Sequence, residues 1–209
     1  MFARKPGRSN HRTCTLAPVL AGVLFLASCQ SLMPLDTVPL DNAGMSYQTI
    51  KELKTLHIAQ PEVREIAEVR QAGLPDSYCA ELLRIFHERH QQFTAGSAAA
   101  GMLHSGMREG TILGLANMDQ LGLGSGELQA MHLAGLSDDI ILEVARRHAS
   151  GQPVLSGASL GNMRNARLDN ATLLELVRRG VPNSEAAEIV ALRRNGRTDA
   201  DILRRLPAP

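Results

Sequence analysis

The sequence of 209 residues predicts an all-α protein, built as an array of short helices. Three observations favour this fold class. One type of turn recurs along the chain, apolar residues follow each turn at helical spacing, and the turns recur with a longer period of about 61 residues. We therefore expect about three repeats of this length, stacked as a small bundle or a solenoid.

The turn is clearest in the segment Ala134–Ile141, which reads Ala-Gly-Leu-Ser-Asp-Asp-Ile-Ile. A glycine such as Gly135 accepts the left-handed backbone conformation that ends a helix, and Ser137 can cap the helix that follows. Ile141 and Val144 stand six and nine positions after the glycine, so they share one face of that helix. We expect Gly135 in the left-handed conformation, and Ile141 and Val144 in the core.

Eight further positions match this pattern of a turn followed by apolar residues: Gly44, His57, Gly73, Gly106, Gly122, Arg167, Gly180 and Gly196. All nine turns have an apolar residue six positions later, although His57 and Arg167 lack the glycine. Gly73, Gly135 and Gly196 lie 62 and 61 residues apart, which sets the length of the repeat. Each repeat then contains three or four short helices, and only stacking against neighbouring repeats can bury their apolar faces.

The N-terminal residues have a different pattern. A basic segment, residues 1–12, precedes the apolar run Thr15–Leu26, and the small residues Ala27 and Ser28 follow. This order is typical of a secretory signal peptide with its cleavage site. The apolar run has 12 residues, whereas a membrane-spanning helix needs about 20. A buried core helix is another possibility, but Pro18 and the basic flank disfavour it.

The segment Leu26-Ala27-Ser28-Cys29 resembles the lipobox of bacterial lipoproteins. In that family the cysteine is acylated, for example with palmitate, and the signal peptide is cut just before it. The resemblance implies that residues 1–28 are the signal peptide, that cleavage falls between Ser28 and Cys29, and that Cys29 carries the lipid anchor. Because Gln30, not aspartate, follows the cysteine, the resemblance favours the outer membrane, facing the periplasm. Plain secretion and a cytoplasmic chain remain alternatives.

The segment after the cysteine differs from the rest of the chain. Residues 29–42 contain Pro34 and Pro39, carry few charges and lack a helical period, so we expect an extended tether. The helical repeat domain is then expected to span residues 43–209. Its Ala-Gly-Leu-Ser-Asp-Asp-Ile-Ile turn resembles the short helical-hairpin repeats of uncharacterised bacterial lipoproteins, over about thirty residues at a time.

Composition limits the partners and the redox chemistry. Residues 1–28 hold four of the 22 basic residues and no acidic one, so 18 basic residues then face 21 acidic residues, a formal net charge of −3. Such a chain lacks the basic stripe of a nucleic-acid-binding protein. Aromatic residues make up 3% of the sequence, so the core must be aliphatic. With Cys14 removed and Cys29 acylated, Cys79 has no disulfide partner and is expected in the core.

Three motifs suggest metal, catalytic or cofactor chemistry without meeting its requirements. His87 and His90 share a helix face two turns after Cys79, so a Cys/His metal site is conceivable. The zinc-protease motif, however, needs histidines four positions apart, and these two are three apart. Gly157–Gly161 matches the G-x-S-x-G motif of hydrolases, but no histidine follows it, so we interpret it as a connector between helices. Gly122–Gly126 is similar to a dinucleotide-binding loop, and we interpret it as another turn.

We expect no catalytic residue, no cofactor and no metal ion. The leading hypothesis is a lipid-anchored protein of the cell envelope that acts as a non-catalytic helical scaffold or as a protein- or peptide-binding module. Its partners would be the membrane, through the anchor, and another envelope protein or peptide. The alternative is a periplasmic metal-binding protein or an enzyme that uses the region of His87 and His90. Arginine pairs such as Arg178-Arg179 lie late in the expected helices, where their charges interact favourably with the carbonyl groups at the helix end. The other interpretation is a basic ridge that faces anionic lipid or an acidic partner.

Overall fold

The structure, a computed structural model, describes residues 34–122 and 125–206. This part of the chain contains α-helices, one short 3₁₀ helix and no strand, which confirms the all-α fold class. Its helices belong to one compact domain that begins at Leu35. In chain order they are α1 (Val38–Asn42), α2 (Tyr47–Thr55), α3 (Gln60–Gln71), α4 (Asp76–Glu88), α5 (Gly96–His104), α6 (Glu109–Asn117), α7 (Ser125–Leu133), α8 (Asp138–Ala149), α9 (Gly157–Asn165), α10 (Asn170–Arg178), the 3₁₀ helix η2 (Asn183–Glu185), α11 (Ala186–Arg194) and α12 (Asp199–Arg205).

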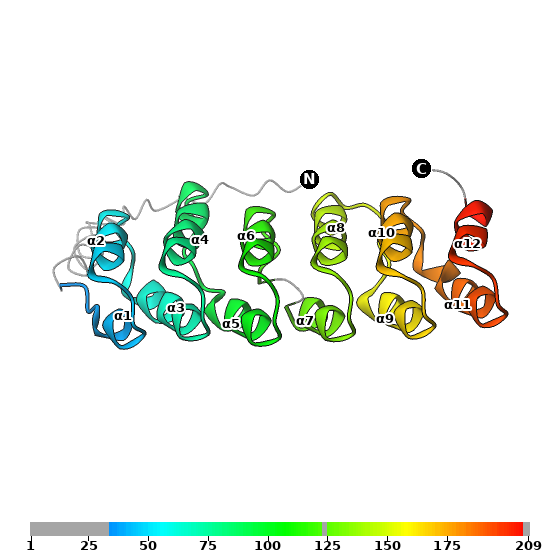
Figure 1. Cartoon of the computed structure of the whole chain (residues 1–209). Coiled ribbons are helices and arrows are strands. Elements are labelled where there is room, and N and C mark those ends of the chain that lie inside the picture. Colours follow the sequence, from blue (N-terminus) through cyan, green and yellow to red (C-terminus); the bar gives the residue numbers. More distant parts are fainter. Residues whose placement is uncertain (1–33, 123–124, 207–209) are drawn as a thin grey trace, which may run out of the picture. The chain divides into compact units, whose positions relative to one another are not determined.

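The helices of this domain lie in two layers (Figure 1). The odd-numbered helices follow one another in one layer, and the even-numbered helices follow one another in the other. Within a layer, each helix packs against the one before it and the one after it. The domain is therefore a solenoid of helix pairs rather than a closed bundle.

Residues in the left-handed conformation join the helices, as the turn motif predicts. Gly135 has a φ of +78°, which confirms the expectation for this residue. Its N–H donates to the carbonyl of His132 at 2.9 Å, and the N–H of Leu136 donates to the carbonyl of Met131 at 3.2 Å. These two hydrogen bonds satisfy carbonyl groups that would otherwise be left unpaired at the end of α7.

The turn between α6 and α7 differs from the prediction. Eight of the nine expected turn positions have a positive φ, but Gly122 does not, and Asp119 forms this turn with a φ of +58°. Aspartate adopts the left-handed conformation more readily than most residues, because its short side chain can bond to nearby backbone groups. His90 and Gly151 end α4 and α8 in the same way, with φ of +57° and +65°, and these two turns were not expected.

Each predicted repeat of about 61 residues contains two helix pairs. The left-handed residues inside successive helix pairs are 29, 33, 29, 32 and 29 residues apart; they are Gly44, Gly73, Gly106, Gly135, Arg167 and Gly196. One helix pair therefore repeats after about 30 residues, and the period of 61 or 62 residues spans two pairs of unequal length. We call α1–α4 the first unit, α5–α8 the second unit and α9–α12 the third unit.

The extended tether predicted for residues 29–42 is wrong at its C-terminal end. Residues 38–42 form α1, in which Leu40 is fully buried, and α1 packs against α3. Pro39 lies in the first turn of α1, where a missing N–H leaves no intrahelical bond unmade. Five residues are too few to show a helical period in the sequence, and the burial of Leu40 stabilises them as a helix. Residues 29–33 lie outside the described residues.

The core is aliphatic over most of its length, as the composition predicts. One continuous cluster of buried side chains runs along the solenoid. It includes Ile141, which is fully buried, and Val144, which is 8% exposed, so both expectations are confirmed. The buried aromatic side chains of the described residues are Phe86 and Phe93, and they meet in the first unit.

Replacing Gly135 by alanine should lower the free energy of unfolding by about 1 kcal/mol or more. A Cβ at this position would meet the Nε of Arg164 at 3.9 Å, an ordinary contact, so the cost comes from the backbone conformation. Chemical denaturation measures the loss. Gly126→Ala is the control, because Gly126 lies in α7 with open space around its Cβ position and alanine there should be neutral or stabilising. An unchanged stability for Gly135→Ala would contradict the left-handed turn.

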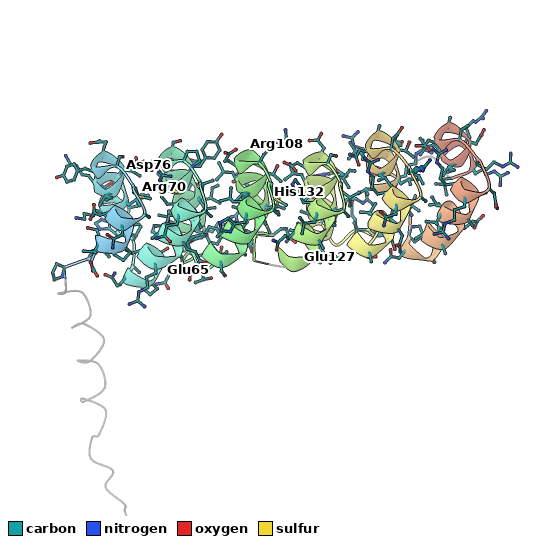
Figure 2. The ribbon with its side chains drawn as sticks, turned by 60° about the horizontal axis from the view of Figure 1, so that its bottom comes forward. Glu65, Arg70, Asp76, Arg108, Glu127 and His132 are labelled. Carbon is teal, nitrogen blue, oxygen red and sulfur yellow. The ribbon has the colours of Figure 1, made fainter. Side chains whose placement is uncertain are left out.

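A buried aspartate ties α6 to α8 in the second unit. Asp138, in the first turn of α8, accepts hydrogen bonds from the N–H of Arg108 at 3.3 Å and the hydroxyl of Thr111 at 2.7 Å. The Nε of Arg108 also donates to this oxygen at 2.8 Å, and the other oxygen lies 3.2 Å from the Nδ1 of His132. Figure 2 shows Arg108 and His132 on neighbouring parts of the second unit. The carboxylate therefore joins three helices, α6, α7 and α8.

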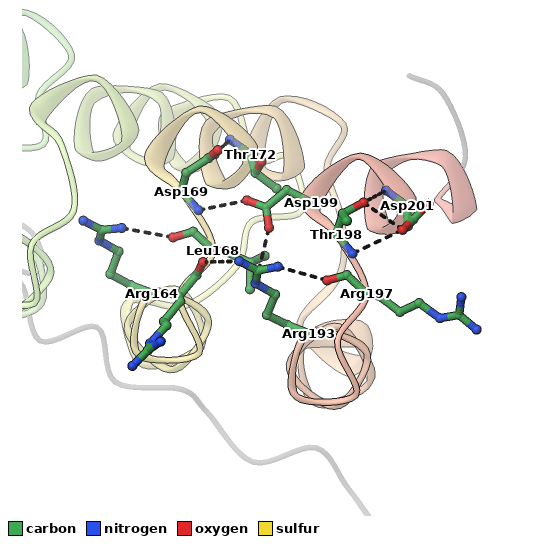
Figure 3. A network of polar contacts seen from close by, with 10 residues as sticks. Arg164, Leu168, Asp169, Thr172, Arg193, Arg197, Thr198, Asp199 and Asp201 are labelled. Carbon is green, nitrogen blue, oxygen red and sulfur yellow. Dashed lines mark hydrogen bonds and ion pairs between the residues drawn. The ribbon is translucent and has the colours of Figure 1, made fainter.

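The same contacts recur in the other two units. One oxygen of the aspartate accepts the N–H of the residue that caps the neighbouring even helix, and the other oxygen pairs with an arginine six positions earlier. In the first unit these groups are Ser46, Asp76 and Arg70, and Figure 2 labels the last two. In the third unit they are Asp169, Asp199 and Arg193 (Figure 3). The contacts link α2 to α4, α6 to α8 and α10 to α12, which gives the period of two helix pairs a structural basis.

Asp138 should make the stability of the fold depend on pH in the acid range. Burial raises the pKa of Asp138, but the hydrogen bonds from Arg108 and Thr111 outweigh burial, and the pKa lies below its ordinary value of 3.8. A carboxylate with a lowered pKa stabilises the folded state above the unfolded-state pKa, and this contribution is lost as the pH falls through the folded-state pKa.

We expect Asp138→Asn to be less stable than the native protein at pH 7 and to lose less stability between neutral pH and pH of about 2. Asp139→Asn is the matched control, because Asp139 is the next residue and is exposed. Urea denaturation at several pH values measures the free energy of unfolding of the native protein and of both variants. A parallel pH dependence in Asp138→Asn and the native protein would contradict the role of this carboxylate.

Two glycines lie at the joints between odd-numbered helices. Gly96 and Gly157 begin α5 and α9, and their N–H groups donate to the carboxylates of Glu65 and Glu127, each at 2.7 Å. Figure 2 shows these two glutamates at corresponding places on α3 and α7. A Cβ on Gly96 would lie 2.5 Å from the carbonyl oxygen of Glu65, so α3 and α5 can approach this closely only with glycine.

Candidate functional site

A cavity of about 420 Å³ opens in the second unit, where α7, α8 and the connector before α9 meet, and Asn183 of η2, in the third unit, also lines it. Its volume lies within the range of about 300–1,000 Å³ that is typical of ligand-binding sites. The cavity is lined by Gln120, Glu127, Leu128, Val144, Ala145, His148, Val154, Leu155, Ser156 and Asn183.

The regular repeat identifies the corresponding place in the first unit. Residues of the second unit up to α8 correspond to residues 62 positions earlier, and residues of the connector before α9 correspond to residues 61 positions earlier. This register is fixed by equivalent residues on both sides of the cavity: the left-handed His57 and Asp119, the left-handed Gly73 and Gly135, and the joint residues Gly96 and Gly157.

Two phenylalanine rings fill that place in the first unit. The rings of Phe86 and Phe93 meet edge to face, with centroids 5.1 Å apart and planes at 73°. Both side chains are buried in the core cluster. Their counterparts in the second unit are His148 and Val154, and both line the cavity.

Two further residues of the cavity wall are smaller than their counterparts. Leu82 and Leu83 of α4 correspond to Val144 and Ala145 of α8. The same backbone frame therefore encloses fewer carbon atoms in the second unit. Because unfilled space in a core costs stability, a cavity at a place that the chain can fill elsewhere is a candidate for a binding site.

The cavity has an apolar floor and a polar rim. Leu128, Ala145 and Leu155 are buried, whereas Glu127, His148 and Asn183 are exposed. Such a surface suits an apolar group that is attached to a polar chain.

Hydrogen bonds fix the orientation of this rim. The Nδ1 of His148 lies 2.9 Å from the Oε1 of Gln120, and the Oδ1 of Asn183 accepts the N–H of Ser156 at 2.9 Å. The Oε1 of Glu127 accepts the N–H of Gly157, as described above. These hydrogen bonds hold the walls in place, which lowers the entropic cost of binding.

The first unit also contains a buried carboxylate that has no counterpart beside the cavity. Glu62 lies 2.8 Å from the Nε2 of His87 and accepts the N–H of Phe93 at 2.9 Å, and its side chain is 2% exposed. The residues 62 positions later in the sequence are Gly124 and Ala149, neither of which can form this pair. Sequence reasoning missed Glu62, because glutamate is almost always exposed.

The structure does not bring Cys79, His87 and His90 together as a metal site. Cys79 is fully buried, as expected for a core residue, and burial raises the pKa of its thiol to about 12. The ring nitrogens of His87 lie 2.8 Å from Glu62 and 3.1 Å from the carbonyl of Leu56. His90 is exposed in the turn after α4. Among the described residues, no three His, Cys, Asp or Glu side chains form a group that could hold a metal ion.

The segment that matches the hydrolase motif is the first turn of α9. Ser156 caps this helix, and its hydroxyl accepts the N–H of Ser159 at 3.2 Å, so Ser159 takes part in a helix start. A Cβ on Gly157 would meet the Cγ of Met131 at 2.8 Å, so close packing explains this glycine. The segment Gly122–Gly126 includes residues 123 and 124, which lie outside the described residues.

Several arginines of the basic pairs bind carbonyl groups of neighbouring helices. Arg147 of α8 donates to the carbonyl of Arg178 at the end of α10 at 3.0 Å, and Arg179 donates to the carbonyl of Leu203 in α12 at 2.8 Å. The expected interaction with terminal carbonyls is thus present, but it joins consecutive helices of the even layer. Arg178 itself is exposed.

The residues of the proposed anchor, Ser28 and Cys29, lie outside the described residues. In the described part of the chain, no helix has both the length and the apolar character needed to cross a membrane. Comparisons with protein families, curated proteins and solved structures found no match.

Proposed function

We propose that this chain is a lipid-anchored protein of the cell envelope that binds another envelope protein or a peptide and catalyses no reaction. The observation that carries the binding role is the cavity of the second unit, at a place where the first unit has a filled core. The proposed location rests on the sequence Leu26-Ala27-Ser28-Cys29.

The environment of the titratable groups supports a binding role over a catalytic one. Asp138 and Glu62 are buried in hydrogen bonds that join helices, and Cys79 is buried in the core. A catalytic acid or nucleophile needs access to a substrate. Among the described residues, the hydrogen-bond partner of His148, which lines the cavity, is the amide of Gln120 and not a carboxylate that would orient it as a base.

Site-specific photo-crosslinking in the native host tests the binding role. A photoreactive amino acid replaces His148 at the rim of the cavity, in the full chain. We expect one discrete crosslinked product. The control places the same amino acid at Tyr47, which is 81% exposed in the first unit. No product at His148, or the same products at both positions, would refute a partner at the cavity.

Mass spectrometry of the protein from its native membrane tests the anchor. We expect a chain that begins at Cys29 and carries acyl chains on that residue. A chain with an intact Met1 and an unmodified thiol at Cys29 would refute the proposed location.

A further inference from the structure

Building on the proposed function, we infer that the cavity of the second unit binds an aromatic side chain presented by the partner polypeptide. The first unit of the chain contains an example of such a contact, because Phe93 from the connector between α4 and α5 packs on Phe86 from α4. In the second unit the same two places hold Val154 and His148. The buried Leu155, whose counterpart Thr94 is exposed, refills part of the volume of the two rings, and a cavity remains. A ring from a partner would restore the packing that the chain makes for itself elsewhere.

The lining of the cavity favours an aromatic side chain on a peptide. Leu128, Val144, Ala145 and Leu155 offer an apolar surface to the ring, and burial of a phenylalanine side chain contributes strongly to binding. Asn183 stands at the same cavity and can donate from its Nδ2 to the backbone that carries the ring, while its Oδ1 accepts the N–H of Ser156.

The charge at the rim argues against a fatty acid as the occupant. Glu127 is exposed and is one of the residues that line the cavity. A second carboxylate at the mouth of the cavity would be repelled by it. The backbone of a peptide carries no such charge.

Binding of small probes to the full chain tests this inference directly. The probes are the N-acetyl amides of phenylalanine, leucine and alanine, together with laurate, and methyl signals of Leu128, Val144 and Leu155 report binding by NMR. We expect the phenylalanine amide to saturate these signals and to bind at least about tenfold more tightly than the alanine amide. No binding of the phenylalanine amide at millimolar concentration, equal binding of the two amides, or tighter binding of laurate would overturn the inference.

A substitution taken from the first unit should close the cavity. Ala145→Leu places in α8 the residue that α4 carries as Leu83, and the first unit accommodates it. We expect this variant to fold and to bind the phenylalanine amide at least about tenfold more weakly. Ala149→Leu is the matched control, because Ala149 lies one turn later on α8, is exposed and does not line the cavity.

A second closing variant keeps the inference testable if Ala145→Leu fails to fold. Val154→Phe introduces the ring that Phe93 supplies in the first unit and should block the probe in the same way. Undiminished binding in a folded closing variant would overturn the inference.

The proposed function is tested separately from this inference. If photo-crosslinking at His148 yields no partner, the proposed function is refuted, whatever the probes show. A partner that is crosslinked equally in Ala145→Leu would leave the binding role intact and refute the aromatic contact.

Discussion

Glu62→Ala is expected to lower the free energy of unfolding by about 3–5 kcal/mol. The carboxylate accepts the N–H groups of Ala59 at 2.7 Å and Phe93 at 2.9 Å, and it pairs with the ring of His87 at 2.8 Å. Alanine would remove all three hydrogen bonds at once. The N–H of Phe93 is buried and would have no new partner, and an unpaired buried group costs about 1–3 kcal/mol by itself.

Urea denaturation of Glu62→Ala measures this loss. Glu68→Ala is the matched control, because Glu68 lies on the same helix, α3, and is exposed. It should change the stability by no more than about 0.5 kcal/mol. A loss below about 1 kcal/mol in Glu62→Ala would show that water replaces the carboxylate and that Glu62 does not hold the connector between α4 and α5.

Ile141→Ala should cost about 2–5 kcal/mol, because it empties the core where α8 faces its neighbours. Ile141 is fully buried, and α8 packs against both α6 and α10 in the even layer. This loss of stability has two parts: the transfer free energy of the carbon atoms that are removed, and the cost of the cavity that they leave. Since a solenoid is stabilised by contacts between adjacent pairs, we expect the loss to weaken both interfaces of α8.

Thermal and chemical unfolding of Ile141→Ala, compared with Leu133→Ala, measure this effect. Leu133 lies at the end of α7 and is 69% exposed, so its replacement should have little effect. Equal stabilities of the two variants would contradict the packing of α8 between α6 and α10.

The sequence predicts the features of this fold that depend on short stretches of chain. The left-handed turn at Gly135 and the burial of Ile141 follow from a signal of eight to ten residues, in which a glycine, a capping residue and an apolar stripe coincide. The turn at Asp119 was missed because Gly122 fits the motif instead, with Leu128 and Met131 six and nine positions after it. The helix at residues 38–42 was missed because only tertiary packing of Leu40 stabilises so short a segment.

Features that depend on contacts about 30 residues apart could not be predicted in this way. The two layers, and the hydrogen bond from Arg108 to Asp138, follow from how pairs stack. The sequence indicates the cavity only when the first and second units are aligned in the correct register. Once residues of α8 are compared with α4, the changes from Leu83 to Ala145 and from Phe86 to His148 indicate missing volume.

The equivalence of the joints at Gly96 and Gly157 has a consequence for the length of the molecule. If residues 96–156 were excised, a stretch of 61 residues, Gly157 would follow the connector that now leads into Gly96. Glu65 could then accept the N–H of Gly157, because Glu127 accepts that same N–H from the equivalent place on α7. The hydrogen bond at this joint would therefore be kept in a chain that is shorter by one unit.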